Sequence, residues 1–392
     1  RGLDTSIKES THKYATVAWL EEIARTMSAF KLAGFTNLAM NRMDAHVSDY
    51  LKKRKAHFRV LIEQYATVTI FKTVVTGGVL ILGAILVVNR EITLGQFVAS
   101  EIVVISILAG VEKIFLSLDI IYDLLTAVQK VGNITDLPLE PTRGVRLECD
   151  TSTAMELRTH NLSYHYSNNT MAGFTNISLT MAAGQHIGLI GPRGSGKHTL
   201  MKVISGQLFN YSGSVEVDGL SLKDINVMSL RDQVGQCVDH PELFEGTIFD
   251  NIAMGKLRIE LEDVTWALKQ VGIENYSSLF ADGLRTRVLP GGRQFNEDTI
   301  KQLLLARAIV ERPRLLLIDE DYLPHGSQAR EAIMQAICSH EHNWTLVVLC
   351  TTREMVARCD KIIGIADGAK QYEGDYKTLI ETPDLDYLLP QV

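Results

Sequence analysis

Two long apolar stretches dominate the first third of the chain. Residues 60–88 contain three charged or amide side chains, and residues 92–111 contain two. Each stretch is long enough to cross a bilayer core of about 30 Å, which takes about 20 helical residues. The short polar link at residues 89–91 predicts a helical hairpin with both ends on the same side of a membrane. A pair of core helices in a soluble domain is the alternative.

Three charged residues interrupt these stretches: Glu63, Lys72 and Glu101. A charge at the bilayer centre costs about 2.5–3.5 kcal/mol on insertion scales, so these residues need a role. They line a pathway between helices, or, for Glu63, the helix continues into the cytosol and the residue lies in water. The pattern leaves both explanations open.

Residues 1–58 alternate charged and apolar positions at helical spacing, and residues 33–37 read as a break between two amphipathic helices. The second helix ends in a basic run at residues 52–55, directly before the apolar stretch. Because positive charge collects on the cytosolic side of a membrane, this end of the hairpin is expected in the cytosol.

The pattern changes after residue 136. Residues 136–153 are rich in helix-breaking residues and predict a linker. From residue 154 onward, short strands predominate up to about residue 220, helices from 228 to 312, and strands alternating with helices from 313 to 375.

A glycine-rich loop at residues 191–199 nearly completes the phosphate-binding pattern G-x-x-x-x-G-K-[ST]. The apolar run before it predicts a buried strand, and the residues after it predict a helix. The backbone N–H groups of such a loop converge on phosphate oxygens, and Lys197 reaches the β- and γ-phosphates. The residues of the predicted nucleotide site here are Gly191, Arg193, Gly194, Ser195, Gly196, Lys197, His198 and Thr199.

His198 departs from the pattern, because it stands where a Ser or Thr hydroxyl holds Mg²⁺. Magnesium prefers oxygen ligands, so nucleotide binding is expected to survive better than metal-assisted chemistry. The hydroxyl of Thr199, the next residue, is the alternative metal ligand.

Residues 315–320 form a second motif, an apolar strand ending in the carboxylates of Asp319 and Glu320. Two acids after an apolar run are a weak pattern alone, but the distance of this pair from the phosphate loop makes the pattern strong.

Composition narrows the class of protein. The 392 residues are 46% hydrophobic, and the net charge is −7. The second half has no long basic patch, so nucleic acid is not an expected partner. The five cysteines form no C-x-x-C pair, which indicates reduced thiols on a cytosolic face. Residue 1 is Arg, and we expect the numbering to begin inside a longer protein.

A membrane hairpin joined by a linker to a phosphate-loop domain resembles the C-terminal part of an ABC exporter half-transporter. The resemblance implies an α/β P-loop NTPase domain with a helical subdomain, preceded by an all-α transmembrane region that is incomplete at the N-terminus. The expected domains are a cytosolic helical extension (1–58), a transmembrane hairpin with its cytosolic extension (59–135), the linker (136–153) and the nucleotide-binding domain (154–392). A short coupling helix is expected near residues 33–43.

The resemblance also assigns roles by position. Residues 315–320 match the Walker B strand, which assigns Asp319 to the magnesium shell and Glu320 to the attacking water. Tyr166 matches the aromatic residue that stacks on adenine, Asp239 the Q-loop glutamine, and Thr351 the switch histidine. The D-loop position reads Leu323-Pro324-His325-Gly326. The signature that holds the γ-phosphate of the opposite subunit falls on Phe295, Asn296, Glu297, Asp298 and Thr299.

Several of these positions lack the side chain that the chemistry needs. Carboxylates at Glu297 and Asp298 repel a phosphate, and Thr351 cannot share a proton as histidine does. We therefore expect a degenerate ATP-binding subunit that works with a second half-transporter in a membrane, with its nucleotide-binding domain in the cytoplasm. A bacterial inner membrane is the expected location, with ATP as the cofactor and Mg²⁺ held weakly. A fully active exporter ATPase and a nucleotide-binding scaffold that transports nothing are the alternatives.

Overall fold

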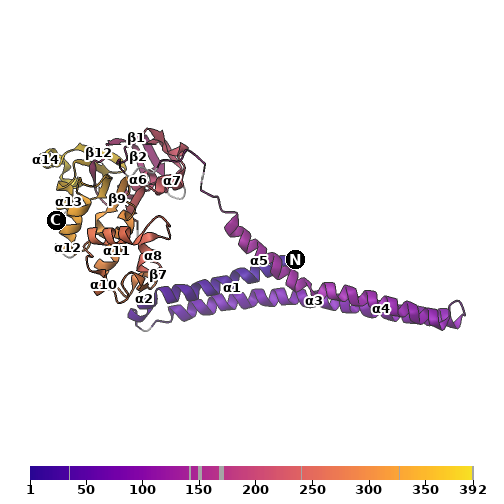
Figure 1. The fold of residues 1–392 in the computed structure, drawn as a ribbon. Coiled ribbons are helices and arrows are strands. Elements are labelled where there is room, and N and C mark those ends of the chain that lie inside the picture. The colour runs from indigo at the N-terminus through magenta and orange to yellow at the C-terminus, as the bar shows by residue number, and fades with distance from the viewer. Residues whose placement is uncertain are drawn as a thin grey trace. The chain divides into compact units, whose positions relative to one another are not determined.

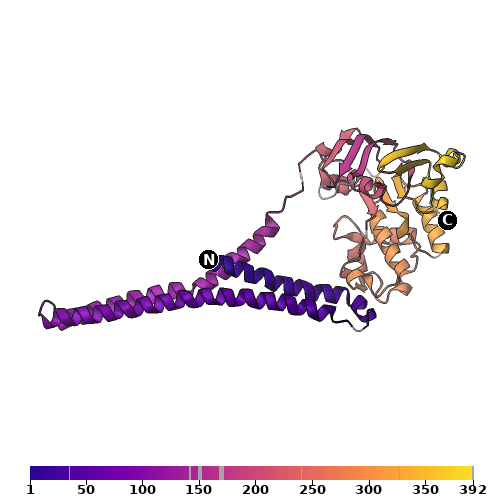
Figure 2. The ribbon, with the colours of Figure 1, turned by 180° about the vertical axis from the view of Figure 1, so that it is seen from behind.

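The computed structural model describes residues 1–34, 36–140, 143–148, 152–166, 172–239, 241–325 and 327–390. The chain forms two compact units, a helical unit at Arg1–Leu139 and an α/β unit at Glu140–Val392. Figures 1 and 2 show the elements of each unit from opposite sides.

The helical unit is built around a long hairpin (Figure 1). Its helices are α1 (Gly2–Arg25), α2 (Met27–Leu32), α3 (Leu38–Val88), α4 (Leu94–Leu116) and α5 (Leu118–Thr135). Helix α1 packs against α3 and α5, and α3 packs against α4. Thr93 starts α4 with a capping box, in which its hydroxyl accepts the Gln96 N–H at 3.3 Å and its own N–H donates to Gln96 Oε1 at 2.9 Å.

Two stretches, Leu38–Val88 and Leu94–Thr135, are long and apolar enough to cross a membrane, and little of either is buried inside the protein. Large apolar side chains such as Ile81, Leu82 and Ile102 are more than half exposed. Exposed apolar surface of this extent is unfavourable in water, which agrees with the predicted membrane hairpin.

Ion pairs account for two of the charges in the apolar stretches. Lys72 Nζ on α3 lies 2.7 Å from a carboxylate oxygen of Glu112 on α4, so the two charges neutralise each other across the hairpin. Glu63 pairs with the side chain of Arg1 at 3.1 Å. Pairing lowers the cost of placing a charge in an apolar environment.

The predicted break at residues 33–37 is confirmed, because these residues connect α2 and α3. Gly34 has φ +69°, a left-handed conformation that ends a helix and that favours glycine, so the chain turns there before α3 begins at Leu38. The coupling helix near residues 33–43 stays a prediction. Phe35, within this break, lies outside the described residues.

A six-stranded sheet forms the centre of the α/β unit. Its order is β12 (Ala369–Gly374), β11 (Lys361–Ala366), β3 (His186–Ile190), β10 (Thr345–Leu349), β9 (Leu315–Asp319) and β6 (Val234–Cys237). All neighbouring strands are parallel except β12, which is antiparallel to β11. The carboxyl ends of β3, β9 and β10 therefore meet at one edge, where ligands of open α/β sheets bind.

Smaller elements surround this sheet. A second sheet has the order β2 (Ala172–Met181), β1 (Leu157–His165), β4 (Tyr211–Val217) and β5 (Leu220–Ser221), and a third pairs β7 (Gly246–Thr247) with β8 (Arg287–Val288). The helices are α6 (Lys197–Ile204), α7 (Val227–Arg231), α8 (Ile248–Ala253), α9 (Leu261–Gln270), α10 (Tyr276–Leu279), α11 (Glu297–Ile309), α12 (Ser327–Ile337), α13 (Arg353–Ala357) and α14 (Tyr376–Ile380). Short 3₁₀ turns are η1 (Leu222–Asp224), η2 (Gly283–Arg285), η3 (Pro290–Gly292), η4 (Glu320–Tyr322) and η5 (Pro383–Leu388).

The six-stranded sheet is buried on both faces, as the continuous apolar strands predict. Along β9, Leu315 and Leu317 belong to one core with the antiparallel sheet and α6, whereas Leu316 and Ile318 belong to a second core with α9 and α11. Successive side chains of a strand point to opposite faces of the sheet, so this one strand contributes residues to both cores.

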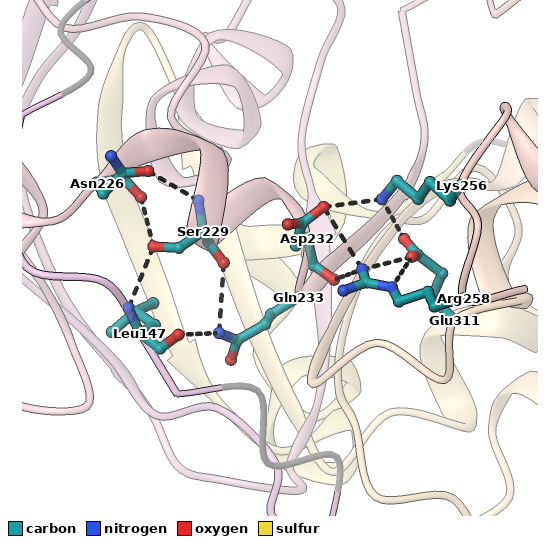
Figure 3. Close-up of polar contacts among 8 residues, drawn as sticks. All are labelled: Leu147, Asn226, Ser229, Asp232, Gln233, Lys256, Arg258 and Glu311. Atoms are coloured by element: carbon teal, nitrogen blue, oxygen red, sulfur yellow. Dashed lines mark hydrogen bonds and ion pairs between the residues drawn. The ribbon is translucent and has the colours of Figure 1, made fainter.

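Hydrogen bonds from side chains of the α/β unit to the backbone of Leu147 attach part of the predicted linker to that unit (Figure 3). The N–H of Leu147 donates to Ser229 Oγ at 3.1 Å, and Gln233 Nε2 donates to the carbonyl of Leu147 at 3.4 Å. Val145 forms a parallel bridge with Ile225. Residues 143–148 are therefore fastened to α7 and its flanks, while residues 141–142 and 149–151 of the linker lie outside the described residues.

A cluster of four charges next to α7 ties the end of that helix to α11 (Figure 3). Lys256 lies between Asp232, at 3.0 Å, and Glu311. Arg258 Nε donates to Glu311 at 2.8 Å. The cluster links the strand-rich part of the unit to its helical part.

Candidate nucleotide site

The glycine loop after β3 has the conformation that the sequence pattern predicts. Gly191 has φ +134°, and a Cβ atom there would lie 1.9 Å from the carbonyl oxygen of Ile365. Gly196 has φ +97°, and a Cβ atom there would lie 2.1 Å from the carbonyl oxygen of Gly173. Both positions therefore exclude any residue with a side chain.

Lys197, the first residue of α6, lies across the loop. Its Nζ donates to the carbonyl oxygens of Gly191 and Pro192 at 2.7 and 2.8 Å, and to Ser195 Oγ at 3.1 Å. Burial lowers the pKa of Lys197 to about 8, and the nearby Asp319 carboxylate opposes that shift. The ammonium group is thus held where phosphate oxygens would replace the loop carbonyls as its partners.

A cleft of about 1020 Å³ opens over this loop. Such a volume is sufficient for a nucleotide. Its lining includes Tyr166, the loop from Gly191 to Thr199, Asp319, Thr351 and the C-terminal residues Tyr387–Pro390. The structure therefore brings together the predicted base-stacking residue, phosphate loop, metal ligand and switch position.

Tyr166 and Thr199 meet in the cleft. The phenol oxygen of Tyr166 lies 3.0 Å from Thr199 Oγ1, and the ring makes an edge contact with Tyr164, with centroids 5.0 Å apart. Thr199 is buried, and its hydroxyl is directed at this phenol. The hydroxyl of Thr199, the alternative metal ligand, is therefore already hydrogen-bonded to Tyr166.

His198 faces the predicted metal ligand directly. Its Nε2 lies 2.9 Å from Asp319 Oδ2, and Asp319 Oδ1 accepts the backbone N–H of Asp321 at 3.0 Å. His198 and Asp319 together offer one imidazole nitrogen and one carboxylate. Because Mg²⁺ prefers oxygen ligands, this pair fits Mg²⁺ poorly.

Glu320 is fully buried, with 0% of its side chain exposed. Its Oε1 accepts from the guanidinium of Arg330 and, at 2.5 Å, from the hydroxyl of Thr352. Its Oε2 accepts from the backbone N–H groups of Thr351 and Thr352 at 2.6 and 3.0 Å. Both oxygens of the expected catalytic carboxylate are therefore occupied by protein donors.

The sequence interpretation missed Arg330 and Thr352. Arg330 is on α12, and 18% of its side chain is exposed. A second threonine directly after the predicted switch position was a visible signal, because a hydroxyl and an N–H at a strand end can both bind a carboxylate. No local pattern connects Arg330 with Glu320.

The Q-loop position lies outside the cleft lining. Asp239 has φ +59°, and its carboxylate pairs with Lys202 of α6 at 2.7 Å. His240, the next residue of that motif, lies outside the described residues. The carboxylate at the predicted Q-loop position is thus paired with the helix that follows the phosphate loop.

The predicted signature position lies at the start of α11. Asn296 Oδ1 accepts the N–H of Thr299 at 2.7 Å and caps the helix. Glu297 pairs with Lys301 at 3.0 Å, and this hydrogen bond lowers the pKa of Glu297. Asp298 accepts the N–H of His325, a D-loop residue, at 2.9 Å. Phe295 packs against the helical core. Gly326, the last D-loop residue, lies outside the described residues.

A glycine loop between a buried parallel strand and a helix, with carboxylates at the end of a strand in the same sheet, defines a P-loop nucleotide-binding domain. Residues 174–323 match the family model of the ABC transporter domain. The α/β unit is therefore an ABC-transporter nucleotide-binding domain, and the predicted fold class is confirmed.

Similarity to ABC exporters extends through the helical unit. The exotoxin translocation ATP-binding protein PaxB of Pasteurella aerogenes is 26% identical over 380 residues, which cover 96% of this chain and 53% of PaxB. The α-hemolysin translocation ATP-binding protein HlyB of Escherichia coli is 26% identical over 374 residues, covering 94% of this chain and 52% of HlyB. The chain spans about half the length of these two relatives.

A solved bacterial Atm1-family ABC exporter with ATP bound has the same fold. It superimposes with a TM-score of 0.87 at 18% identity, covering 97% of this chain and 66% of the exporter chain. The chain thus carries helices of the ABC-exporter kind followed by an ABC nucleotide-binding domain, and the predicted resemblance is confirmed.

Proposed function

We propose that this chain is the ATP-binding subunit of an ABC-type membrane exporter in which ATP is bound but hydrolysed slowly. It works with a second half-transporter, in a bacterial inner membrane, with the nucleotide-binding domain on the cytoplasmic side. ATP binding then biases the membrane helices through closure of two nucleotide-binding domains.

The phosphate loop supports the ATP-binding part of the proposal. Gly191 and Gly196 allow the backbone to approach an anion, and Lys197 lies within the loop with a positive charge. Tyr166 lines the same cleft and offers a ring on which adenine stacks. These residues would hold the phosphates and the base of ATP.

The slow-hydrolysis part rests on the environment of Glu320. A carboxylate that polarises water needs a free oxygen directed at the nucleotide, whereas both oxygens of Glu320 accept hydrogen bonds from Arg330, Thr351 and Thr352. This is the single observation that carries the proposal. Loss of one preorganised transition-state contact typically costs about 2.7–4 kcal/mol, which is a rate factor of about 10²–10³.

The residues at the predicted metal and signature positions also support slow hydrolysis. His198 engages Asp319, which weakens the site for Mg²⁺. Glu297 and Asp298 place two carboxylates where a signature motif would meet the γ-phosphate on a partner domain. Because each ABC site combines one domain's phosphate loop with the other domain's signature, the defects would affect both sites of a dimer.

The test uses the full chain in detergent or nanodiscs. Binding of a fluorescent ATP analogue is titrated with and without Mg²⁺, and phosphate release is followed on the same sample. Lys197→Ala serves as the non-binding control, and Glu320→Gln tests the carboxylate.

We expect binding that changes little with Mg²⁺ and phosphate release no faster than that of Lys197→Ala. Magnesium-dependent turnover that Glu320→Gln abolishes would overturn slow hydrolysis and indicate an active exporter ATPase. Absence of ATP binding would overturn the proposal and favour a scaffold.

A further inference from the structure

Three segments that are distant in the sequence meet at the edge of the sheet opposite the phosphate loop. His186 is the first residue of β3, whereas the loop follows its last residue. His340 lies between α12 and β10, and Asp360 lies directly before β11. Their candidate ligand atoms all lie within 4.8 Å of one another.

His186 lacks the partners that a buried imidazole requires. Only 1% of the residue is exposed, and neither Nδ1 nor Nε2 has a hydrogen-bond partner among the described residues. Burial lowers the pKa of His186 to about 4, so the ring is neutral and offers a lone pair. An unpaired polar group in a protein interior is unfavourable and indicates that something binds to it.

The other two residues stand at the open side of this ring. The rings of His186 and His340 are stacked, with centroids 4.1 Å apart and planes within 5°. His340 Nε2 lies 3.5 Å from Asp360 Oδ1, while Asp360 Oδ2 accepts the backbone N–H of His186 at 2.8 Å. The side chain of His340 is 62% exposed, so it can turn from the stacked position and direct a ring nitrogen at a shared ion.

No neighbouring lysine neutralises Asp360 among the described residues. Lys361, the next residue, is directed away, because its Nζ pairs with Glu373 and donates to the carbonyl of Thr180 at 2.9 Å. Lys361 therefore does not occupy the Asp360 carboxylate.

We propose that His186, His340 and Asp360 bind a divalent transition-metal ion, with Zn²⁺ as the best match. Two imidazole nitrogens and one carboxylate oxygen form a donor set that zinc accepts, and water completes the four ligands. The same set suits Mg²⁺ poorly, since magnesium prefers oxygen ligands. This site is separate from the nucleotide cleft and independent of the proposed function.

The experiment titrates the full chain, without an affinity tag, with Co²⁺ and Zn²⁺. Cobalt reports four-coordinate binding by its visible absorption, and zinc is scored by its displacement of cobalt and by the shift in thermal midpoint. His340→Ala and Asp360→Asn change exposed ligands, and the amide oxygen that Asp360→Asn introduces would still accept the backbone N–H of His186. His160→Ala, an exposed histidine on β1, is the matched control.

We expect one ion per chain in the parent and in His160→Ala, with affinity at least about tenfold weaker in His340→Ala and Asp360→Asn. ATP-analogue binding by each variant checks that the domain is folded. Equal metal affinity in the parent and both ligand variants would overturn the proposal, as would the absence of any cobalt absorption or zinc-dependent thermal shift. In that case a buried water would be the partner of His186.

Discussion

Replacing Arg330 by methionine should destabilise the nucleotide-binding domain strongly. Arg330 is the cation that faces Glu320, whose side chain is 0% exposed. Removing one partner of a buried ion pair leaves an uncompensated charge and typically costs about 3–5 kcal/mol. Thr351 and Thr352 continue to donate to the carboxylate, and 18% of the Arg330 side chain is exposed. We therefore expect the lower end of this range, about 3 kcal/mol.

Thermal unfolding followed by tryptophan fluorescence measures this effect. Trp266 and Trp344 report on the domain, and a Trp19→Phe background removes the tryptophan of the helical unit. For a domain of this size, a loss of about 3 kcal/mol corresponds to a fall in the thermal midpoint of about 6–12 °C.

The matched control is Arg353→Met, which removes an arginine from a pair with Asp386 that is 43% and 70% exposed. A surface pair contributes about 0–1 kcal/mol, so its midpoint should hardly move. Adding Glu320→Gln to Arg330→Met should cost less than the sum of the two single changes, because the double variant leaves no buried charge unpaired. Equal midpoints for Arg330→Met and Arg353→Met would refute the reasoning.

Three further predictions concern ATP binding. Gly196→Ala should abolish binding of an ATP analogue, because its Cβ atom would lie 2.1 Å from the carbonyl oxygen of Gly173; unchanged affinity would contradict the loop geometry. Tyr166→Ala should weaken ATP binding about 5- to 150-fold through the loss of about 1–3 kcal/mol of stacking, and a similar loss in Tyr166→Phe would instead implicate the phenol. His198→Ser should return a hydroxyl to the metal position and free Asp319, so Mg²⁺ should strengthen ATP binding about tenfold or more in this variant only; equal Mg²⁺ dependence in both proteins would show that His198 does not block the metal.

Local sequence signals predicted the framework of the site correctly. The glycines of the loop have the positive φ angles that the pattern requires, and β3 and α6 flank it. The apolar strand that ends at Asp319 is β9. Both signals depend on residues that are neighbours along the chain. A few glycines therefore predict the backbone conformation of the loop, and a short apolar run predicts the buried strand.

The interruption between α1 and α2 was less accessible. The sequence predicts one amphipathic helix before the break at residues 33–37, but α1 ends at Arg25 and α2 begins at Met27. Helix ends depend on single residues, which makes them the weakest part of a prediction from periodicity.

The sequence by itself determined the class of the protein, helices of the ABC-exporter kind followed by a phosphate-loop domain. It also predicted altered side chains at the metal, signature and switch positions. Only the tertiary structure showed that His198 contacts Asp319 and that Arg330 contacts Glu320. It also brought His186 and His340 together. The physical reason is that these residues are far apart along the chain. The order and register of the parallel strands bring them together, and no local sequence pattern predicts that order.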